Sequence, residues 1–416
     1  MKKVKIGVLG GARGTSMINY CLQANNAEVV AICDKRQDVL DGQKQNTKGY
    51  NIAFYDNFED FIQHDMDAVV LANYADEHAP FAIRCMKAGK HVFSEVLPVK
   101  TVKEAVELIE CVEETGMIYA YGENYCYMAA PYEMRRLYRE GRLGELEYAE
   151  GEYIHNCETI WPDITYGERD HWRNRMFSTY YCTHSVGPII HATGLRPVSV
   201  IGFEGTKTER YRRIGRKSGQ FGIEMVKLEN GAIVKSIHGG LYQDSIWYTM
   251  YGSNGRLESA REDTMTDDVS HIYVRLDDYP GAYTGVPIKD YYPHREFDDD
   301  AKDFGHGNSD FYTMWHFVEK IKGNPDADII DVYEAVDMGF VGLFAYRSIL
   351  DGHKEVQIPN LRDKSIRDAW RDDVACTDPA IAGDQLLPTF SLGTPDIPDE
   401  VYEEQRRKYE ERSSKE

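Results

Sequence analysis

A short apolar strand followed by a glycine-rich turn, KVKIGVLGGARGTSM at residues 3–17, constrains the fold of this chain more than any other stretch. Its apolar run predicts a buried strand, and Gly10, Gly11 and Gly14 then open a helix that runs to about Gln23. Such a turn lets the backbone approach a pyrophosphate closely and directs the positive end of the helix dipole at it. The stretch therefore predicts a dinucleotide site.

The glycine spacing departs from the usual G-x-G-x-x-G pattern. Ala12 occupies the position of the second glycine and Thr15 that of the third, so Gly14 stands one place early. Support comes from Asp34, which ends the predicted strand AEVVAICD twenty residues after Gly14. An acidic side chain there takes ribose hydroxyls and repels a 2′-phosphate, so we expect NAD rather than NADP, although Lys35 and Arg36 follow directly. The alternative is a glycine-rich turn ahead of an ordinary helix.

Predicted strands and helices alternate after Asp34, which is typical of a parallel sheet wound on both faces by helices. The strand DAVVLANY places Asn73 beside the cofactor, and His78 follows in the next loop. His78 is either a base at the cofactor site or a structural cap, and the structural role is favoured. The strand KHVFSE stops at Glu95. We predict a Rossmann domain over residues 1–123.

Composition excludes several classes of function. Lys and Arg number 48 against 69 Asp and Glu, and the net charge of -21 repels phosphate, so nucleic acid and membrane are not expected partners. The chain lacks an apolar run of the ~20 residues that a membrane helix needs, and its start has no signal-peptide cleavage site, which favours a cytoplasmic protein. The eight cysteines form no C-x-x-C pair, so we expect buried thiols and no metal site.

Long strands separated by turns such as Glu-Asn-Gly and Ser-Asn-Gly follow residue 123. The pattern predicts an α/β protein in which the Rossmann domain precedes an α+β domain, residues 124–365, with a large open, mostly antiparallel sheet. Residues 366–416 are expected to be an irregular extension that ends in a polar helix from about Asp399. Because such a sheet would expose an apolar face, we expect a homodimer or homotetramer formed through it.

A long loop is predicted between two strands of this sheet, at residues 159–194, and it is rich in Trp, Tyr, His and Arg. Loops of this length in compact domains are usually functional. Trp172 and Tyr181 can stack on a sugar ring, Arg173 can donate to hydroxyls, and His184 can accept a proton near neutral pH. The alternative is that His184 and the tyrosines fill core space. Farther on, Asp310 either caps a helix or orients a substrate hydroxyl, and capping is favoured.

Several strings taken together, GVLGGARG, NYADEH, AGKHVFSEVLP and GENYCYMAAP, resemble the Gfo/Idh/MocA oxidoreductases in order and spacing. That resemblance implies an NAD-binding Rossmann domain and an open-sheet domain. The family usually carries Glu-Lys-Pro after the fifth strand, where the lysine assists hydride transfer, whereas here Glu95 is followed by Val96. The role of that lysine must pass to another residue, or the reaction differs from ordinary alcohol oxidation.

The string YCTHSVGP around His184 is similar to YPTHGLGP of the NAD-dependent alpha-N-acetylgalactosaminidases, one branch of the same superfamily. GENYCY, YYPH and GHGNSDF also resemble strings of that branch, and Glu95-Val96 matches its Glu-Val. The resemblance implies two sets of contacts in this chain. Those expected to touch NAD are Arg13, Gly14, Asp34, Glu95, Val96 and Asn124. Those expected to touch a sugar are Arg173, Tyr181, His184 and Tyr292.

These observations predict an NAD-dependent oxidoreductase that removes hydride from a pyranose carbon of a sugar or glycoside, with C3 the most plausible position. His184 or Tyr181 would take the hydroxyl proton. One alternative is a redox-neutral glycosidase, in which a transient C3 ketone permits elimination of the anomeric substituent and the hydride then returns. A second alternative is an NAD-binding scaffold without turnover. The sequence does not distinguish the sugar, its anomer or its leaving group.

Overall fold

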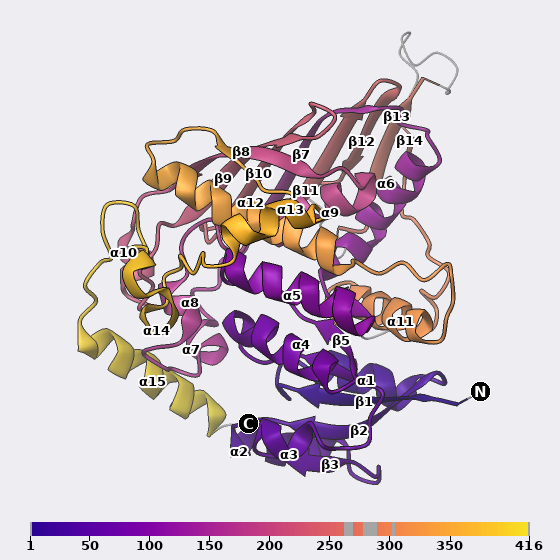
Figure 1. Cartoon of the computed structure of the whole chain (residues 1–416), viewed down its shortest axis with the longest axis vertical. Helices are drawn as coiled ribbons and strands as arrows, with labels where there is room; N and C mark the ends of the chain where they lie inside the picture. The colour runs from indigo at the N-terminus through magenta and orange to yellow at the C-terminus, as the bar shows by residue number, and fades with distance from the viewer. Residues whose placement is uncertain (1, 262–268, 278–288, 302–303, 415–416) are drawn as a thin grey trace.

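The computed structural model describes residues 2–261, 269–277, 289–301 and 304–414. Two sheets lie one above the other, with helices packed between and around them (Figure 1). The first sheet is confined to residues 4–121 and the second to residues 146–357. The division into domains at 123 and 365 stays a prediction, although no named strand of one sheet enters the other within the described residues.

The first sheet is parallel, as predicted, with six described strands in the order β3-β2-β1-β4-β5-β6. Its central strand β1 has fully buried Ile6 and Val8 because helices cover both faces. The strands are β1 (Val4–Leu9), β2 (Ala27–Cys33), β3 (Ala53–Tyr55), β4 (Ala68–Leu71), β5 (His91–Ser94) and β6 (Tyr119–Tyr121).

The helices of this half follow the strands in alternation. In α5 the apolar residues recur at helical spacing, the Thr101 side chain accepts from the amide of Glu104, and Gly116 ends the helix with φ +64°. The helices are α1 (Thr15–Gln23), α2 (Gln37–Asn46), α3 (Phe58–Phe61), α4 (His78–Lys87) and α5 (Val102–Thr115), with a short 3-10 helix at Ala75–Glu77.

The second sheet has nine described strands in the order β14-β13-β12-β11-β7-β10-β9-β8-β15. It is mostly antiparallel, as predicted, and the β7–β10 pair is parallel. The strands are β7 (Leu146–Ile154), β8 (Pro197–Glu204), β9 (Phe221–Leu228), β10 (Ile233–Gly239), β11 (Ser245–Gly252), β12 (Gly255–Ser259), β13 (Ile272–Leu276), β14 (Lys289–Tyr291) and β15 (Val356–Gln357).

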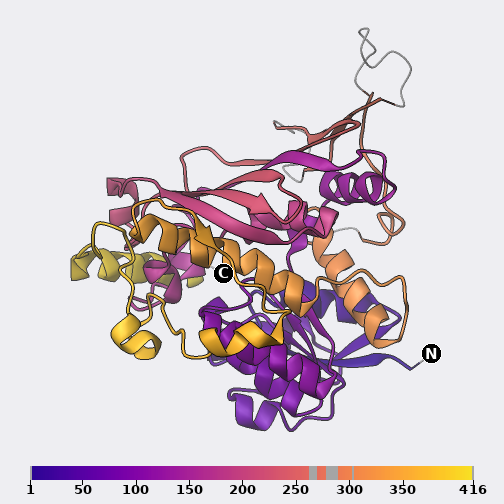
Figure 2. The ribbon, with the colours of Figure 1, turned by 45° about the horizontal axis from the view of Figure 1, so that its top comes forward.

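Helices cover one face of this sheet and leave the other face open (Figure 2). The long apolar helix α12 (Val332–Leu350) packs on β8, where a Cβ on Gly202 would lie 2.2 Å from the backbone oxygen of Ala345. The same layer contains α6 (Ala129–Arg139) and α9 (Thr183–Thr193). Helix α11 (Ser309–Ile321) packs instead against α1 of the Rossmann half, and the 3-10 helix Asn124–Tyr127 links the two halves.

The expectation of one long loop at residues 159–194 is wrong. The segment contains α7 (Trp161–Ile164), α8 (Trp172–Arg175) and the regular helix α9. Val186, Ile189 and Ile190 recur at helical spacing and are buried against β7, where Gly151 leaves room for the backbone of Ser185. Pro188 lies inside α9, which obscured this helix in the sequence.

The C-terminal extension is short-helical and ends, as predicted, in a polar helix that begins at Asp399. The helices of the extension are α13 (Lys364–Arg367), α14 (Pro379–Ala382) and α15 (Asp399–Ser413), with 3-10 helices at Asp368–Trp370 and Gly383–Gln385. The short helix α10 (Glu209–Arg212) lies earlier in the chain, between β8 and β9. Helix α15 returns to the Rossmann half and ends near α2 (Figure 1).

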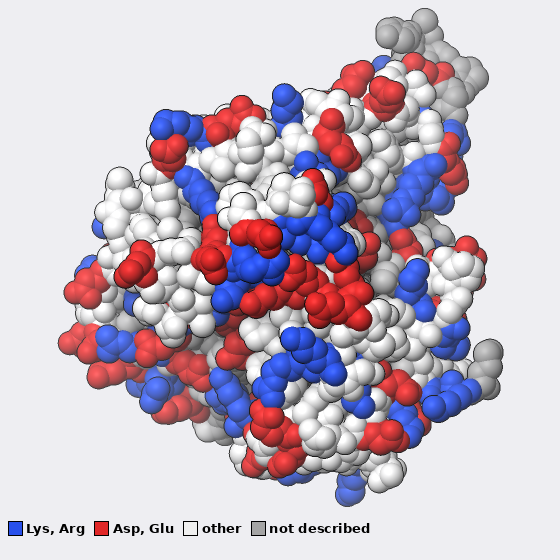
Figure 3. Space-filling view, in the orientation of Figure 1, with Lys and Arg blue, Asp and Glu red and all other residues white. Residues whose placement is uncertain are grey.

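Charged side chains of both signs are interspersed over one face of the molecule (Figure 3). Among the described residues, no helix is long and apolar enough to span a membrane. The cytoplasmic location stays a prediction. All eight cysteines are unpaired and seven are buried, as the sequence indicated.

Candidate functional site

The glycine turn after β1 has the tight backbone that a nucleotide site needs. Gly10 has φ +97°, and a Cβ there would lie 2.3 Å from the backbone of Ala72 at the end of β4. A Cβ on Gly14 would lie 2.5 Å from the oxygen of Gly10. Only glycine fits these positions, so the turn brings bare backbone to the start of α1.

Asp34 lies directly after β2, and its side chain ties the end of that strand to the glycine turn after β1. One carboxylate oxygen accepts from the amide of Gly11 at 2.8 Å and the other from the amide of Arg36 at 2.9 Å. Burial raises the pKa of Asp34, while these two amides oppose that shift. Each oxygen keeps a free lone pair for ribose hydroxyls.

A cavity of about 570 Å³ begins at this turn and extends between the two halves of the molecule. The Asn73 side-chain oxygen is buried there and has no hydrogen-bond partner among the described residues, so a donor in the cavity would satisfy it. The expected site residues that line the cavity are Gly10, Ala12, Arg13, Asp34, Asn73, Glu95, Val96, Trp172, Arg173 and Tyr181.

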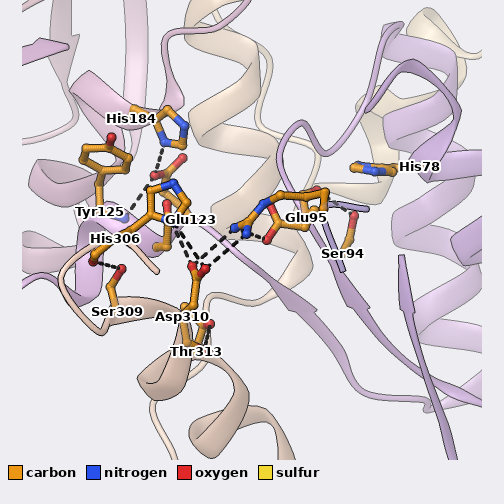
Figure 4. Close-up of polar contacts among 12 residues, drawn as sticks. His78, Ser94, Glu95, Glu123, Tyr125, His184, His306, Ser309, Asp310 and Thr313 are labelled. Carbon is orange, nitrogen blue, oxygen red and sulfur yellow. Dashed lines mark hydrogen bonds and ion pairs between the residues drawn. The ribbon is translucent and has the colours of Figure 1, made fainter. Parts of the chain in front are cut away.

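Other expected contacts lie outside this lining. The His78 ring bonds the backbone oxygens of Leu97 and Asn73, and its burial lowers its pKa to about 4, which fits the structural role and not a cofactor contact. Tyr292 is 52% exposed and stacks on His271 at the sheet edge, so this chain does not bring it to His184. Figure 4 shows His78 apart from the other labelled residues.

An ion network crosses the cavity wall between the halves. Arg13 donates to Glu95 at 2.7 Å and to Asp310 at 3.1 Å, and Asn124 donates to Asp310 at 3.0 Å. Burial raises the pKa of Glu95 to about 7, with Arg13 opposing it. Burial would raise the pKa of Asp310 too, but Arg13 and His306 hold it below its ordinary value. Asn124 therefore positions Asp310 and does not itself line the cavity.

The capping role favoured for Asp310 is wrong. Helix α11 has Asn308 at its N-cap position without a side-chain cap, and the Asp310 carboxylate is turned toward Arg13, Asn124 and His306 instead. The sequence could not show this, because Arg13 and Asp310 are 297 positions apart.

His184 forms a buried dyad that the sequence did not reveal. Its Nδ1 lies 2.5 Å from an oxygen of Glu123, just before the 3-10 helix at residue 124 (Figure 4). The other oxygen of Glu123 is buried without a partner among the described residues. Rings of Tyr125, Tyr153 and Tyr181 surround the imidazole at 4.3, 4.7 and 5.2 Å between centroids. His184 itself lies behind Tyr181, which lines the cavity.

The aromatic wall predicted from the sequence is present at the same end of the cavity. Trp172 stacks on Tyr181 with centroids 6.4 Å apart, and the Arg173 guanidinium lies over both rings. Burial raises the pKa of Tyr181, while Arg173 opposes the shift. This wall offers a flat apolar surface with a cation beside it.

His306 is a second titratable group near the dyad, and sequence reasoning gave it no role. It has φ +55°, and its Nδ1 lies 3.2 Å from Asp310 while its ring faces Tyr125. Burial lowers the pKa of His306, but its hydrogen bond and charge interaction with Asp310 raise the pKa by more, so the net shift is upward. The string GHGNSDF was the available signal for this loop.

Two family models match this chain, together over more than half of its length. Residues 4–123 match the oxidoreductase family with an NAD-binding Rossmann fold, and residues 204–368 match the glycosyl hydrolase 109 C-terminal domain. A glycosyl hydrolase family 109 protein from Shewanella putrefaciens is 25% identical over 412 residues, covering 89% of this chain and 86% of the relative. One from Shewanella pealeana is 24% identical over 409 residues, covering 89% and 87%.

Solved structures with this fold include two inositol dehydrogenases. Scyllo-inositol dehydrogenase from Lactobacillus casei, solved with NAD(H) and scyllo-inositol, has a TM-score of 0.65 at 17% identity, covering 86% of this chain and 99% of that one. Myo-inositol 2-dehydrogenase from Lactobacillus plantarum has a TM-score of 0.65 at 18% identity, covering 86% and 100%. The glycine turn, Asp34 and the unsatisfied Asn73 oxygen fit NAD as the cofactor. Residues 4–123 therefore form an NAD-binding domain of the Gfo/Idh/MocA oxidoreductase family, and the chain is an NAD-dependent enzyme whose residues 204–368 match the glycosyl hydrolase 109 C-terminal domain.

Proposed function

We propose that this enzyme removes hydride from C3 of a sugar or glycoside bound against Trp172 and Tyr181. The observation that carries the proposal is the buried His184–Glu123 dyad beside the cavity. With Val96 in place of the usual lysine, the segment after β5 and Glu95 offers no ammonium at that position to take the hydroxyl proton. An imidazole held in place by a carboxylate is a suitable base.

Each residue of the site has a definite part in this reaction. Glu123 fixes the orientation of the His184 ring through Nδ1, which leaves the other ring nitrogen to accept the proton. Since Tyr181 lines the cavity and lies next to His184, its hydroxyl can pass the proton inward. Arg173 can donate to substrate hydroxyls, and bound NAD supplies the hydride acceptor.

A second function, redox-neutral glycoside hydrolysis, is favoured by the match to the glycosyl hydrolase 109 domain. A C3 ketone acidifies the C2 proton, which allows the anomeric substituent to leave by elimination; water then adds and the hydride returns. That sequence needs an acid for the leaving oxygen as well as a base. His306, whose pKa Asp310 raises, is the candidate for the acid. A scaffold without turnover would not need two such groups.

The test is a panel of glycosides incubated with the protein while NADH absorbance and aglycone release are followed together. Lasting NADH indicates a dehydrogenase, and aglycone without lasting NADH indicates the redox-neutral glycosidase. Absence of both signals across α- and β-glycosides, with NAD bound, would contradict the proposed activity.

We further propose that the open face of the second sheet is covered by another copy of the chain. Ile223, Met225 and Ile237 alternate with inward residues of β9 and β10 and are only partly buried, and Phe203 on β8 is 44% exposed. An apolar stripe on the uncovered face favours self-association. Light scattering is expected to give a dimer or tetramer at micromolar concentration, and a monomer would contradict it.

A further inference from the structure

The last helix, α15, is tied to the substrate half along its length. Tyr402 donates to the oxygen of Gly215 at 3.0 Å, and Arg412 donates to the oxygen of Thr159 at 2.8 Å and to Asp163 at 2.6 Å. At Gly167 the two backbones touch, since a Cβ there would lie 2.5 Å from the Cα of Arg406. The helix is therefore a packed part of the fold and not a loose tail.

The far end of α15 crosses to the Rossmann half. The Arg36 guanidinium donates to the Tyr409 hydroxyl at 2.5 Å and to Asp38 at 2.6 Å, and the Tyr409 hydroxyl donates to Asp38 at 3.2 Å. Arg36 also lies 4.2 Å from the centre of the Tyr166 ring, and Tyr166 meets Tyr409 edge to face. These contacts join the start of α2 to the C-terminal helix, which ends beside it (Figure 1).

This junction lies at the nucleotide end of the cavity. Asp34, Arg36 and Tyr166 all line it, as does Asp163, which α15 holds through Arg412. Arg36 stands two positions after Asp34, where an arginine accommodates the 2′-phosphate of NADP. Here its charge is already paired with Asp38 and its position is fixed by two tyrosines.

We propose that α15 is a strap over the adenosine half of the bound cofactor, and that Tyr409 is a positioning residue that sets both retention of NAD and discrimination against NADP. By holding Arg36 against Asp38, Tyr409 keeps this cation away from a 2′-phosphate. By joining α15 to α2, it keeps the nucleotide end of the cavity closed. The inference rests on NAD binding, and it explains how a redox-neutral cycle of the kind proposed above would keep its cofactor between turnovers.

The test compares Tyr409→Phe with the parent, both as full chains. The substitution keeps the ring against Tyr166 and removes only the hydroxyl, and a hydrogen bond to a charged group is worth roughly a factor of ten or more in binding. We expect NAD to dissociate about tenfold faster and the ratio of the Kd for NADP to that for NAD to fall about tenfold. Cofactor release is followed with the protein loaded with NADH, whose fluorescence changes on dissociation during dilution, and both Kd values are measured by calorimetry.

Two further variants separate the parts of the proposal. Asp38→Asn removes the charge that neutralises Arg36 but leaves the Tyr409 hydroxyl, so NADP discrimination should fall with a smaller effect on NAD release. The matched control is Tyr50→Phe, which changes an exposed tyrosine of the Rossmann half. It should leave the NAD release rate and the ratio of the two Kd values unchanged. If Tyr409→Phe behaves like Tyr50→Phe in both measurements, the strap is refuted. A parent that holds NAD but acts on no glycoside would contradict only the proposed reaction.

Discussion

The two ends of the cavity are built in different ways. At the nucleotide end, the Gly10–Gly14 turn and Asp34 come from neighbouring strands, and the Asp34 contact to Gly11 joins residues 23 positions apart. At the reaction end, Asp310 meets Arg13, whose backbone belongs to that turn, across 297 positions, and His184 meets Glu123 across 61. The nucleotide end relies mainly on backbone shape, whereas the reaction end relies on buried charges that only the complete fold brings together.

We therefore expect variants at the two ends of the cavity to have different defects. Changes at the reaction end should lower turnover or stability and leave NAD binding near the parent value. Changes at the nucleotide end should weaken binding and leave turnover at saturating NAD nearly intact. The comparison fails if a variant at one end shows the defect expected of the other.

The largest expected effect is that of His184→Ala. Loss of a positioned base costs about 10²–10⁴-fold in rate, so hydride removal from a glycoside should slow at least about a hundredfold. NAD affinity, set at the other end, should stay at the parent value in a calorimetric titration. Glu123→Gln should also slow the reaction, because the His184 ring loses the carboxylate that orients it. A parent rate in His184→Ala would make Tyr181 the leading base.

Asp310→Asn should break the ion network at the reaction end. The substitution removes the charge that Asp310 sets against Arg13 and His306, which costs roughly 3 kcal/mol of the free energy of unfolding. Urea denaturation measures this loss. Glu404→Gln on α15, in an exposed i, i+3 pair with Arg407, is the control and should leave the urea midpoint unchanged. Equal midpoints for the two variants would mean that the network does not join the halves.

The free energy of unfolding should depend on pH through the titration of Glu95. Its pKa in the folded protein is raised to about 7, from an ordinary value near 4.5, chiefly by burial. The folded state therefore binds more protons between these values, and this contribution is complete below pH 4.5 and is lost as pH rises through 7. Relative to Glu95→Gln, the parent should lose about 3 kcal/mol over this window, measured by urea denaturation at several pH values. A constant difference would contradict the assignment.

Asp34→Asn should give the smallest effect and affect the nucleotide end alone. The amide oxygen can still accept from Gly11, but the charge that holds ribose hydroxyls and repels a 2′-phosphate is gone. We expect NAD affinity to fall about tenfold and NADP to bind better than in the parent. At saturating NAD, kcat should stay close to that of the parent. Tighter binding of NADP than NAD by the parent itself would overturn the role of Asp34.

Sequence reasoning predicted both sheets, the glycine turn and the aromatic wall, because each depends on a local pattern. It placed His184 in a long loop rich in Trp, Tyr, His and Arg, whereas the structure shows helix α9 there, with Pro188 inside it. It also included Tyr292 among the substrate contacts, and this residue lies at the sheet edge. The assignment of catalytic and binding roles to the site residues remains a prediction that the variants above test.

By itself, the sequence determined the parallel and antiparallel sheets, the cofactor class and the kinds of side chain available for chemistry, since periodicity, glycine positions and strand-end acids act over short stretches. Only the tertiary structure decided which of those side chains meet. Glu123 beside His184, Asp310 beside Arg13, and Tyr409 beside Arg36 join segments from different parts of the chain. Such contacts follow from how layers pack and how buried charges find partners, and no local pattern in the sequence records them.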